Sequence, residues 1–198
     1  MVLEAALSAG FSALGFYAPS GEATFMGLPV LSSLEELGLS KFGFAIGLGA
    51  NVSREDEYAR IKTVFPEALF PEIVHPSAWV SPYARISECT VLTSMASTGA
   101  RSVIGAAALL NTGASVDHDS YLGVFGSLAP GARTGGGVNV GARSAIGMQA
   151  GVAHGVTIGD DVVVAAHSFV VADIPSEVVA IGVPAITVRA RFRDDPYL

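Results

Sequence analysis

One short segment of the chain, Asp117-His118-Asp119, carries residue types that general-base catalysis uses. A carboxylate that is hydrogen-bonded to one ring nitrogen of a histidine orients the ring and makes it more basic, so the other nitrogen can take a proton from an attacking group. Histidines beside acids are also common on protein surfaces, where they have no chemical role. Asn111 could orient a polar acceptor, or it could only hydrogen-bond its own turn. The segment predicts a proton-transfer site centred on His118, with Asn111 as a candidate substrate contact.

The elements that position this segment repeat every six residues. Between Val74 and Val170, fifteen of the seventeen residues taken at steps of six are Val, Ile or Leu. Glycine often follows this aliphatic residue, and a second small residue often comes four positions after it. Such a period is typical of a hexapeptide-repeat parallel β-helix, in which three hexapeptides form one triangular coil. The aliphatic residue then points inward, the small residue fills the corner and glycine relieves the turn. We expect a mainly β protein with five to six coils, wound left-handed against the usual handedness of parallel crossovers.

A coil of eighteen residues converts sequence separation into distance. Residues that are eighteen apart stack at about 4.8 Å, so His118 lies beneath Gly136, and His154 lies one coil beyond. Three consecutive glycines, residues 135–137, leave bare backbone N–H and C=O groups that could bind a ligand, or they could only make a tight corner. His154 is about 9–10 Å from His118, too far for both to ligate one metal ion.

Metal and disulfide chemistry find little support elsewhere in the sequence. No pair of histidines has the spacing that would support a zinc-dependent carbonic anhydrase built on the same β-helix. The single cysteine, Cys89, can form no internal disulfide and has no metal-type spacing. His75 and His167 are predicted to be structural. We therefore expect no metal.

The first 72 residues have a different, α/β pattern. We expect a helix over residues 1–9, a strand over 11–17, a strand over 42–46 and a helix from Ser53 to the residue before Pro66. Ser32 and Ser33, followed by Glu35 and Glu36, form a capping-box pattern for a further helix that ends at Gly38. The predicted organisation is an α/β domain over 1–72, a β-helix over 73–185 and a C-terminal tail over 186–198. Three tail arginines, Arg189, Arg191 and Arg193, are either a solvated end or a local anion contact.

Composition excludes several classes of partner. The 198-residue chain has a formal net charge of −7, so it lacks the basic surface that nucleic-acid binding needs. No apolar run is long enough for a membrane helix, and the first residues lack the positive charge of a signal peptide. With one cysteine, a cytoplasmic location is expected.

Several segments together resemble the bacterial hexapeptide acetyltransferases. They run from Asn111 to Ser120 (Asn-Thr-Gly-Ala-Ser-Val-Asp-His-Asp-Ser), from Leu128 to Ala132 (Leu-Ala-Pro-Gly-Ala) and from Ile181 to Ala185 (Ile-Gly-Val-Pro-Ala). The resemblance is to the group that includes sialic-acid O-acetyltransferases and the N-acetyltransferases of nucleotide-linked 4-amino-6-deoxy sugars.

This resemblance implies acetyl transfer from acetyl-CoA to a sugar or nucleotide-sugar acceptor, with N-acetylation favoured over O-acetylation. It implies a homotrimer with sites in the grooves between neighbouring β-helices. His118 would take the acceptor's proton, Asp119 would orient the ring, and Asn111 would lie near the acceptor. The pantetheine arm of the co-substrate would pass four small residues: Gly136, Gly147, Ala165 and Gly182.

Three departures from the family pattern concern the acceptor. The family begins with a strand and a Gly-x-Gly-Gly-His loop, whereas this chain starts in the helix that follows them, so we expect a truncated Rossmann-like α/β domain. The Asp pair that contacts the nucleotide is replaced by Ala18-Pro19, and a histidine associated with the acetyl carbonyl is replaced by Ser127. The alternative function is therefore a catalytically weak trimeric scaffold that has lost its nucleotide-sugar site.

Overall fold

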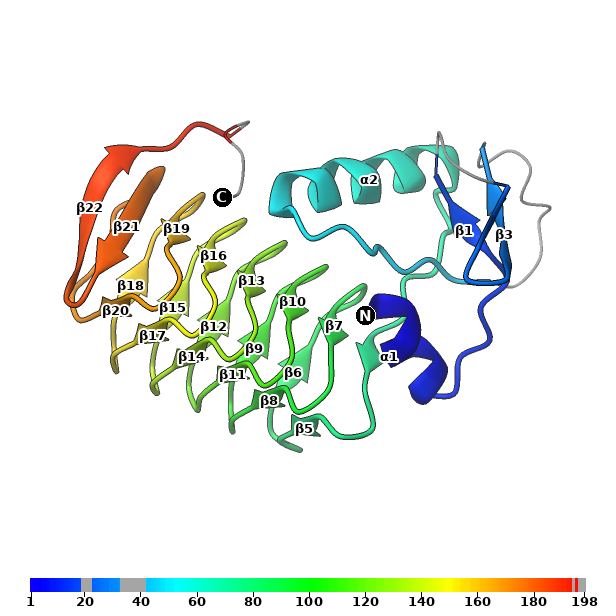
Figure 1. The fold of residues 1–198 in the computed structure, drawn as a ribbon. Helices are drawn as coiled ribbons and strands as arrows, with labels where there is room; N and C mark the ends of the chain where they lie inside the picture. Colours follow the sequence, from blue (N-terminus) through cyan, green and yellow to red (C-terminus); the bar gives the residue numbers. More distant parts are fainter. Residues whose placement is uncertain (19–22, 33–41, 194, 196–198) are drawn as a thin grey trace.

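The computed structural model describes residues 1–18, 23–32, 42–193 and 195. Within residues 73–182, two-residue strands alternate with turns and stack into three parallel sheets, so the chain forms a parallel β-helix (Figure 1). The predicted repeat architecture is confirmed. Its register is eighteen residues, since Leu109 pairs with both Val91 and Ser127.

The three sheets take every third strand. The first sheet contains β4 (Ile73–Val74), β7 (Val91–Leu92), β10 (Leu109–Leu110), β13 (Ser127–Leu128), β16 (Ala145–Ile146), β19 (Val163–Val164) and β21 (Val178–Gly182). The second contains β5 (Trp79–Val80), β8 (Ser97–Thr98), β11 (Ser115–Val116), β14 (Arg133–Thr134), β17 (Gly151–Val152) and β20 (Phe169–Val170). The third contains β6 (Arg85–Ile86), β9 (Val103–Ile104), β12 (Tyr121–Leu122), β15 (Asn139–Val140) and β18 (Thr157–Ile158).

The core is the column of inward residues that the six-residue period identified. From Leu92 to Val170 every member of the series is buried, including Thr98 and Thr134. The buried hydroxyl of Thr134 is hydrogen-bonded, because Oγ1 accepts from the backbone N–H of Asp117 at 3.1 Å. Burial of one aliphatic side chain contributes about 1.5–3 kcal/mol, so the stacked series dominates the stability of the coils.

The glycines that follow the inward residues do not relieve the turns, contrary to the sequence interpretation. The turns do contain a position with a positive φ angle, but it lies two residues after the glycine position. Most residues there are not glycine, for example Cys89, Arg101 and Asp119. The glycines instead allow close approach between coils. A Cβ on Gly105 would lie 2.6 Å from the backbone nitrogen of Val124, and a Cβ on Gly123 would lie 2.6 Å from that of Ala142.

The N-terminal region contains α1 (Val2–Ser8), β1 (Phe16–Tyr17), β2 (Thr24–Phe25), β3 (Leu28–Leu31) and α2 (Asn51–Val64). Both helices were predicted to within two residues. The strands were predicted less well. Only 16–17 of the strand expected over 11–17 forms, and 42–46 makes a single bridge, from Gly43 to Leu69. Strands β2 and β3 were not predicted. The helix expected after Ser32 and Ser33, ending at Gly38, and residue Pro19 fall outside the described residues.

The three sheets form the faces of a triangular prism. Helix α2 is fixed to the edge of this prism where the turns connect the third sheet to the first (Figure 1). The guanidinium of Arg54 is buried and donates to the backbone oxygens of Ala107 and Phe125, both at 2.7 Å. The Asn51 side chain donates to the backbone oxygen of Arg143 at 2.9 Å. Because these acceptors belong to three successive coils, the helix covers much of the length of this edge.

The C-terminal residues add a strand and a buried arginine. Strand β22 (Ala185–Ala190) pairs antiparallel with β21. Arg191 is 3% exposed and donates to the backbone oxygen of Asp161, so it is not part of a solvated end. Arg193 is ion-paired with Glu55 and Asp56 of α2. In the part of the chain that the structure describes, no helix has the length and apolar character needed to cross a membrane.

Candidate active site

His118 lies in the turn that joins β11 to β12, on the edge between the second and third sheets, here called the His118 edge. The turn holds its own backbone firmly. The Asp117 carboxylate accepts the N–H of His118 at 2.7 Å, and the buried Ser120 hydroxyl contacts the backbone oxygens of both His118 and Gly135 at 3.2 Å. Asp119 has a φ of 57°, a left-handed conformation that places its side chain beside the preceding ring.

The structure brings Asp119, and not Asp117, to the imidazole. Nδ1 of His118 lies 2.7 Å from Oδ2 of Asp119. Arg101, one coil earlier, donates to the same carboxylate through two bonds of 2.6 Å. The arginine, and secondarily the histidine, lower the pKa of Asp119 to about 2, so the carboxylate is ionised at physiological pH. An ionised acceptor at Nδ1 places the ring proton there and leaves Nε2 with a lone pair.

Gly136 makes room for the ring of His118. A Cβ at this position would lie 2.5 Å from both Cε1 and Nε2 of the imidazole. The stacking predicted from the eighteen-residue coil is therefore confirmed, and the histidine ring itself occupies the space that a side chain at residue 136 would fill.

The prediction of bare backbone groups at residues 135–137 is wrong for the N–H groups. The N–H of Gly135 donates to Val152 O at 2.8 Å, that of Gly136 to Nδ1 of His154 at 2.9 Å, and that of Gly137 to His118 O at 2.9 Å. The C=O of Gly136 also accepts from Gly155 at 3.0 Å. Backbone oxygens of adjacent coils take two of these N–H groups and the His154 side chain takes the third, so the three N–H groups are not open to a ligand in this arrangement.

The other predicted site residues lie elsewhere on the prism. Asn111, Gly147 and Ala165 follow strands of the first sheet, on the edge that leads to the second sheet, here called the Asn111 edge. Gly182 ends β21, and its N–H donates to Ser168 Oγ at 3.0 Å. Asn111 Oδ1 accepts from the N–H of Thr112 at 2.9 Å, which is the turn-capping contact that the sequence left open. One chain does not bring Asn111 and His118 together, because they occupy different edges. Ser127 is buried in β13 of the first sheet.

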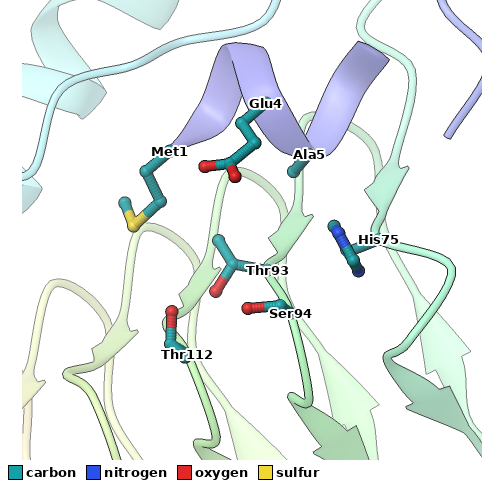
Figure 2. A pocket seen from close by; sticks show the side chains of 7 residues that line it. All are labelled: Met1, Glu4, Ala5, His75, Thr93, Ser94 and Thr112. Atoms are coloured by element: carbon teal, nitrogen blue, oxygen red, sulfur yellow. The ribbon is translucent and has the colours of Figure 1, made fainter. Parts of the chain in front are cut away.

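A small polar hollow of about 50 Å³ opens beside the Asn111 edge (Figure 2). Its lining residues are Met1, Glu4, Ala5, His75, Thr93, Ser94 and Thr112. Figure 2 shows the Glu4 carboxylate and the hydroxyls of Thr93, Ser94 and Thr112 gathered around it. Sequence reasoning treated His75 as structural and missed its place in this lining. The eighteen-residue period could have predicted this place, because it stacks residues 75, 93 and 111 in one column along the Asn111 edge.

No group of three or more histidine, cysteine or acidic side chains among the described residues could hold a metal ion. Cys89 is buried, and this burial raises the pKa of its thiol to about 11. A thiol with so high a pKa is a poor nucleophile at neutral pH, because the thiolate is the reactive form. Proton transfer at His118 is therefore the chemistry that the arrangement supports.

Residues 127–172 match the family model described as bacterial transferase hexapeptide (six repeats). Among solved structures, the acetyltransferase domain of PglB from Neisseria gonorrhoeae FA1090, in complex with acetyl coenzyme A, is 30% identical. That match covers 94% of this chain and 92% of the other, with a TM-score of 0.89.

A second similar structure is a variant of GDP-perosamine N-acetyltransferase from Caulobacter crescentus, in complex with CoA and GDP-perosamine. It is 35% identical over 95% of this chain and 90% of that chain, with a TM-score of 0.87. WeeI from Acinetobacter baumannii AYE, at 23% identity, 88% and 85% coverage and a TM-score of 0.80, shares the fold.

Proposed function

This chain belongs to the bacterial hexapeptide-repeat acetyltransferases, and we propose that it transfers the acetyl group of acetyl-CoA to the amine of a nucleotide-linked amino sugar. The observation that carries the proposal is the pairing of His118 with Asp119 at 2.7 Å. It leaves Nε2 of an exposed imidazole available as a base. The two similar structures described above bind acetyl coenzyme A in one case, and CoA with GDP-perosamine in the other.

In the proposed reaction His118 takes a proton from the acceptor nitrogen. The nitrogen attacks the thioester carbon, a C–N bond forms, and the C=O electron pair moves onto oxygen. Nε2 accepts the proton that the nitrogen loses. The pair then returns from oxygen, the C–S bond breaks, and the CoA thiolate takes up a proton from the imidazolium or from water. A positioned general base contributes about 10²–10⁴-fold to such a step.

The separation of the two edges supports a homotrimer. The third edge is covered by α2, whereas the His118 edge and the Asn111 edge both flank the second sheet. Three chains arranged with their second sheets towards a common axis would set the His118 edge of one against the Asn111 edge of the next. Such head-to-tail contacts form a closed ring when the rotation that relates one chain to the next brings the last chain back to the first. Each site would then take its base from one chain and Asn111 from its neighbour.

The hollow beside the Asn111 edge supports a polar acceptor. Hydroxyls of threonine and serine, with the carboxylate of Glu4, can bind hydroxyl groups of a sugar, because the hydroxyls donate and accept hydrogen bonds and the carboxylate accepts them. In the trimer we propose, this hollow would face the neighbour's His118. Gly147, Ala165 and Gly182 would then flank the pantetheine arm, where small residues leave space.

The decisive experiment is an acetyl-transfer assay on the intact protein. Acetyl-CoA and GDP-, UDP- or dTDP-linked 4-amino sugars are incubated with it, free thiol is measured, and the product is identified by mass spectrometry. The matched 4-hydroxy sugars separate N- from O-acetylation. We expect an N-acetylated product. Acetyl-CoA binding without any transfer would refute the proposed acceptor, and the absence of acetyl-CoA binding by calorimetry would favour the scaffold alternative.

A further inference from the structure

Two histidine rings, not one, converge on Gly136. His118 reaches it from the preceding coil, with Cε1 and Nε2 2.5 Å from the position of a Cβ. His154 reaches it from the following coil, and its Nδ1 accepts the N–H of Gly136 at 2.9 Å. The same ring covers Gly135, whose Cβ would lie 2.9 Å from Nδ1. The separation of about 9–10 Å expected from the sequence applies to the backbones two coils apart. The two side chains reach Gly136 from opposite coils, so the rings flank the same residue.

The two rings are held in opposite tautomers. A neutral imidazole carries one ring proton, so a nitrogen that accepts a hydrogen bond leaves the proton on the other nitrogen. In His154 the acceptor is Nδ1, which places the proton on Nε2. In His118 Nδ1 faces the ionised carboxylate of Asp119, which leaves Nε2 as the acceptor. Among the described residues neither Nε2 has a hydrogen-bond partner, and both rings are exposed. The edge thus presents one acceptor and one donor, on the two rings that flank Gly136.

From this pair we propose that His154 is a second catalytic residue, whose Nε2–H donates a hydrogen bond to the thioester carbonyl oxygen as negative charge develops on it. The inference rests on the proposed function. His154 transfers no proton: the bond to oxygen strengthens while the C–N bond forms, and it weakens again when the C–S bond breaks. A fixed donor aimed at a developing oxyanion needs no reorganisation during the reaction, and this is why such donors are effective.

This role also accounts for the engaged N–H of Gly136. A backbone N–H at the base of the site would itself suit an oxyanion, but here it donates to His154. The ring takes up this donor, and its own Nε2–H, on an exposed residue, is available to a ligand instead. Among the described residues no carboxylate contacts His154, so nothing prepares it as a second base.

Two isosteric substitutions separate this role from a purely structural one. In His154→Asn, the amide oxygen can take the place of Nδ1 and accept the Gly136 N–H, but the outward donor is lost. In His154→Gln, the amide nitrogen can take the place of Nε2 and donate, but the contact with Gly136 is lost. We expect His154→Asn to lower kcat by about 10²-fold, the usual effect of removing one oxyanion donor. Acetyl-CoA affinity should stay the same, and His154→Gln should keep most of the activity.

The opposite ranking, with Asn active and Gln inactive, would overturn the proposal, because it would mean that only the contact with Gly136 matters. Equal losses in both variants together with a lower Tm would also overturn it. A wild-type protein without acetyl transfer would overturn the proposed function and this role with it. A wild type that is active and matched by His154→Asn would contradict only the role of His154.

The tautomers can be read without any assay of activity. In protein labelled with ¹⁵N-histidine, long-range ¹H–¹⁵N spectra at about pH 8, above the ordinary imidazole range, distinguish protonated from unprotonated ring nitrogens. We expect the proton on Nε2 in His154 and on Nδ1 in His118. A proton on Nδ1 of His154 would refute the proposal, whether or not the protein is active.

Discussion

Replacing Gly136 with alanine should abolish most of the activity while leaving the fold intact. The added Cβ would lie 2.5 Å from two atoms of the His118 ring, whereas carbon atoms in contact are normally about 3.5–4.0 Å apart. The ring must therefore move by about 1 Å or more. Since it is an exposed side chain, it can swing outward cheaply, but doing so breaks the 2.7 Å contact with Asp119. A misplacement of about 1 Å costs about 10²-fold in rate, so we expect this loss in kcat.

Gly99→Ala is the contrasting variant on the same edge. A Cβ there would overlap the backbone nitrogen of His118, which cannot swing away. Overpacking against rigid atoms costs about 1–3 kcal/mol, so this variant should lose stability, which urea unfolding would detect. Gly136→Ala should instead keep the wild-type Tm, because residue 136 does not have a positive φ and alanine fits its backbone.

A double-mutant cycle shows whether Gly136→Ala acts through the ring. If it does, adding Gly136→Ala to His118→Ala should change the residual rate little, because residues that act as a unit are strongly non-additive. Steady-state kinetics with a confirmed acceptor measures the loss of kcat in each single variant and in the double variant. Full activity in Gly136→Ala, or a further large loss in the double variant, would refute this reasoning.

Four further predictions follow from the same geometry. His118→Ala should lower the acetyl-transfer rate by about 10²–10⁴-fold and Asp119→Asn by less. In thermal melts His118→Ala should keep the wild-type Tm, and Asp119→Asn should lose only the small contribution of its exposed ion pair with Arg101. Arg101→Gln should let the pKa of Asp119 rise from about 2 towards 3.8. The carboxylate's contribution to stability, which is present above the ordinary pKa and lost as pH falls through the folded pKa, should then disappear at a higher pH in acid titrations followed by histidine NMR. Arg54→Ala should destabilise the protein by about 3 kcal/mol in urea unfolding, because it leaves buried backbone oxygens such as that of Ala107 without a donor. Light scattering should give a homotrimer of about 60 kDa, and a monodisperse monomer would contradict the shared site.

The N-terminal region was the part of the fold that sequence patterns described least well. The two helices were found because their caps, breaks and apolar spacing are local signals. The strands were predicted less well because an apolar run does not say which partner will pair with it. Phe42–Ile46 has the composition of a strand, yet its described strand pairing is one bridge between Gly43 and Leu69, and Ile46 is buried by packing in a hydrophobic cluster. Nor did any pattern indicate that Arg54 would be buried and that Arg54 and Asn51 together would bind three successive coils through α2.

The sequence by itself determined the β-helix, the inward column from Leu92 to Val170 and the stacking of His118 over Gly136. It could do so because a strict period of six makes position along the chain equivalent to position in space. The family resemblance named Asp119 as the residue that orients the ring, and the tertiary structure shows the contact. Only the tertiary structure decided that Nδ1 of His154 takes the N–H of Gly136. Those outcomes depend on side-chain rotamers and on the left-handed turns at every sixth residue, which direct each side chain towards a particular coil. A repeat fixes where a residue lies, but not where its side chain points.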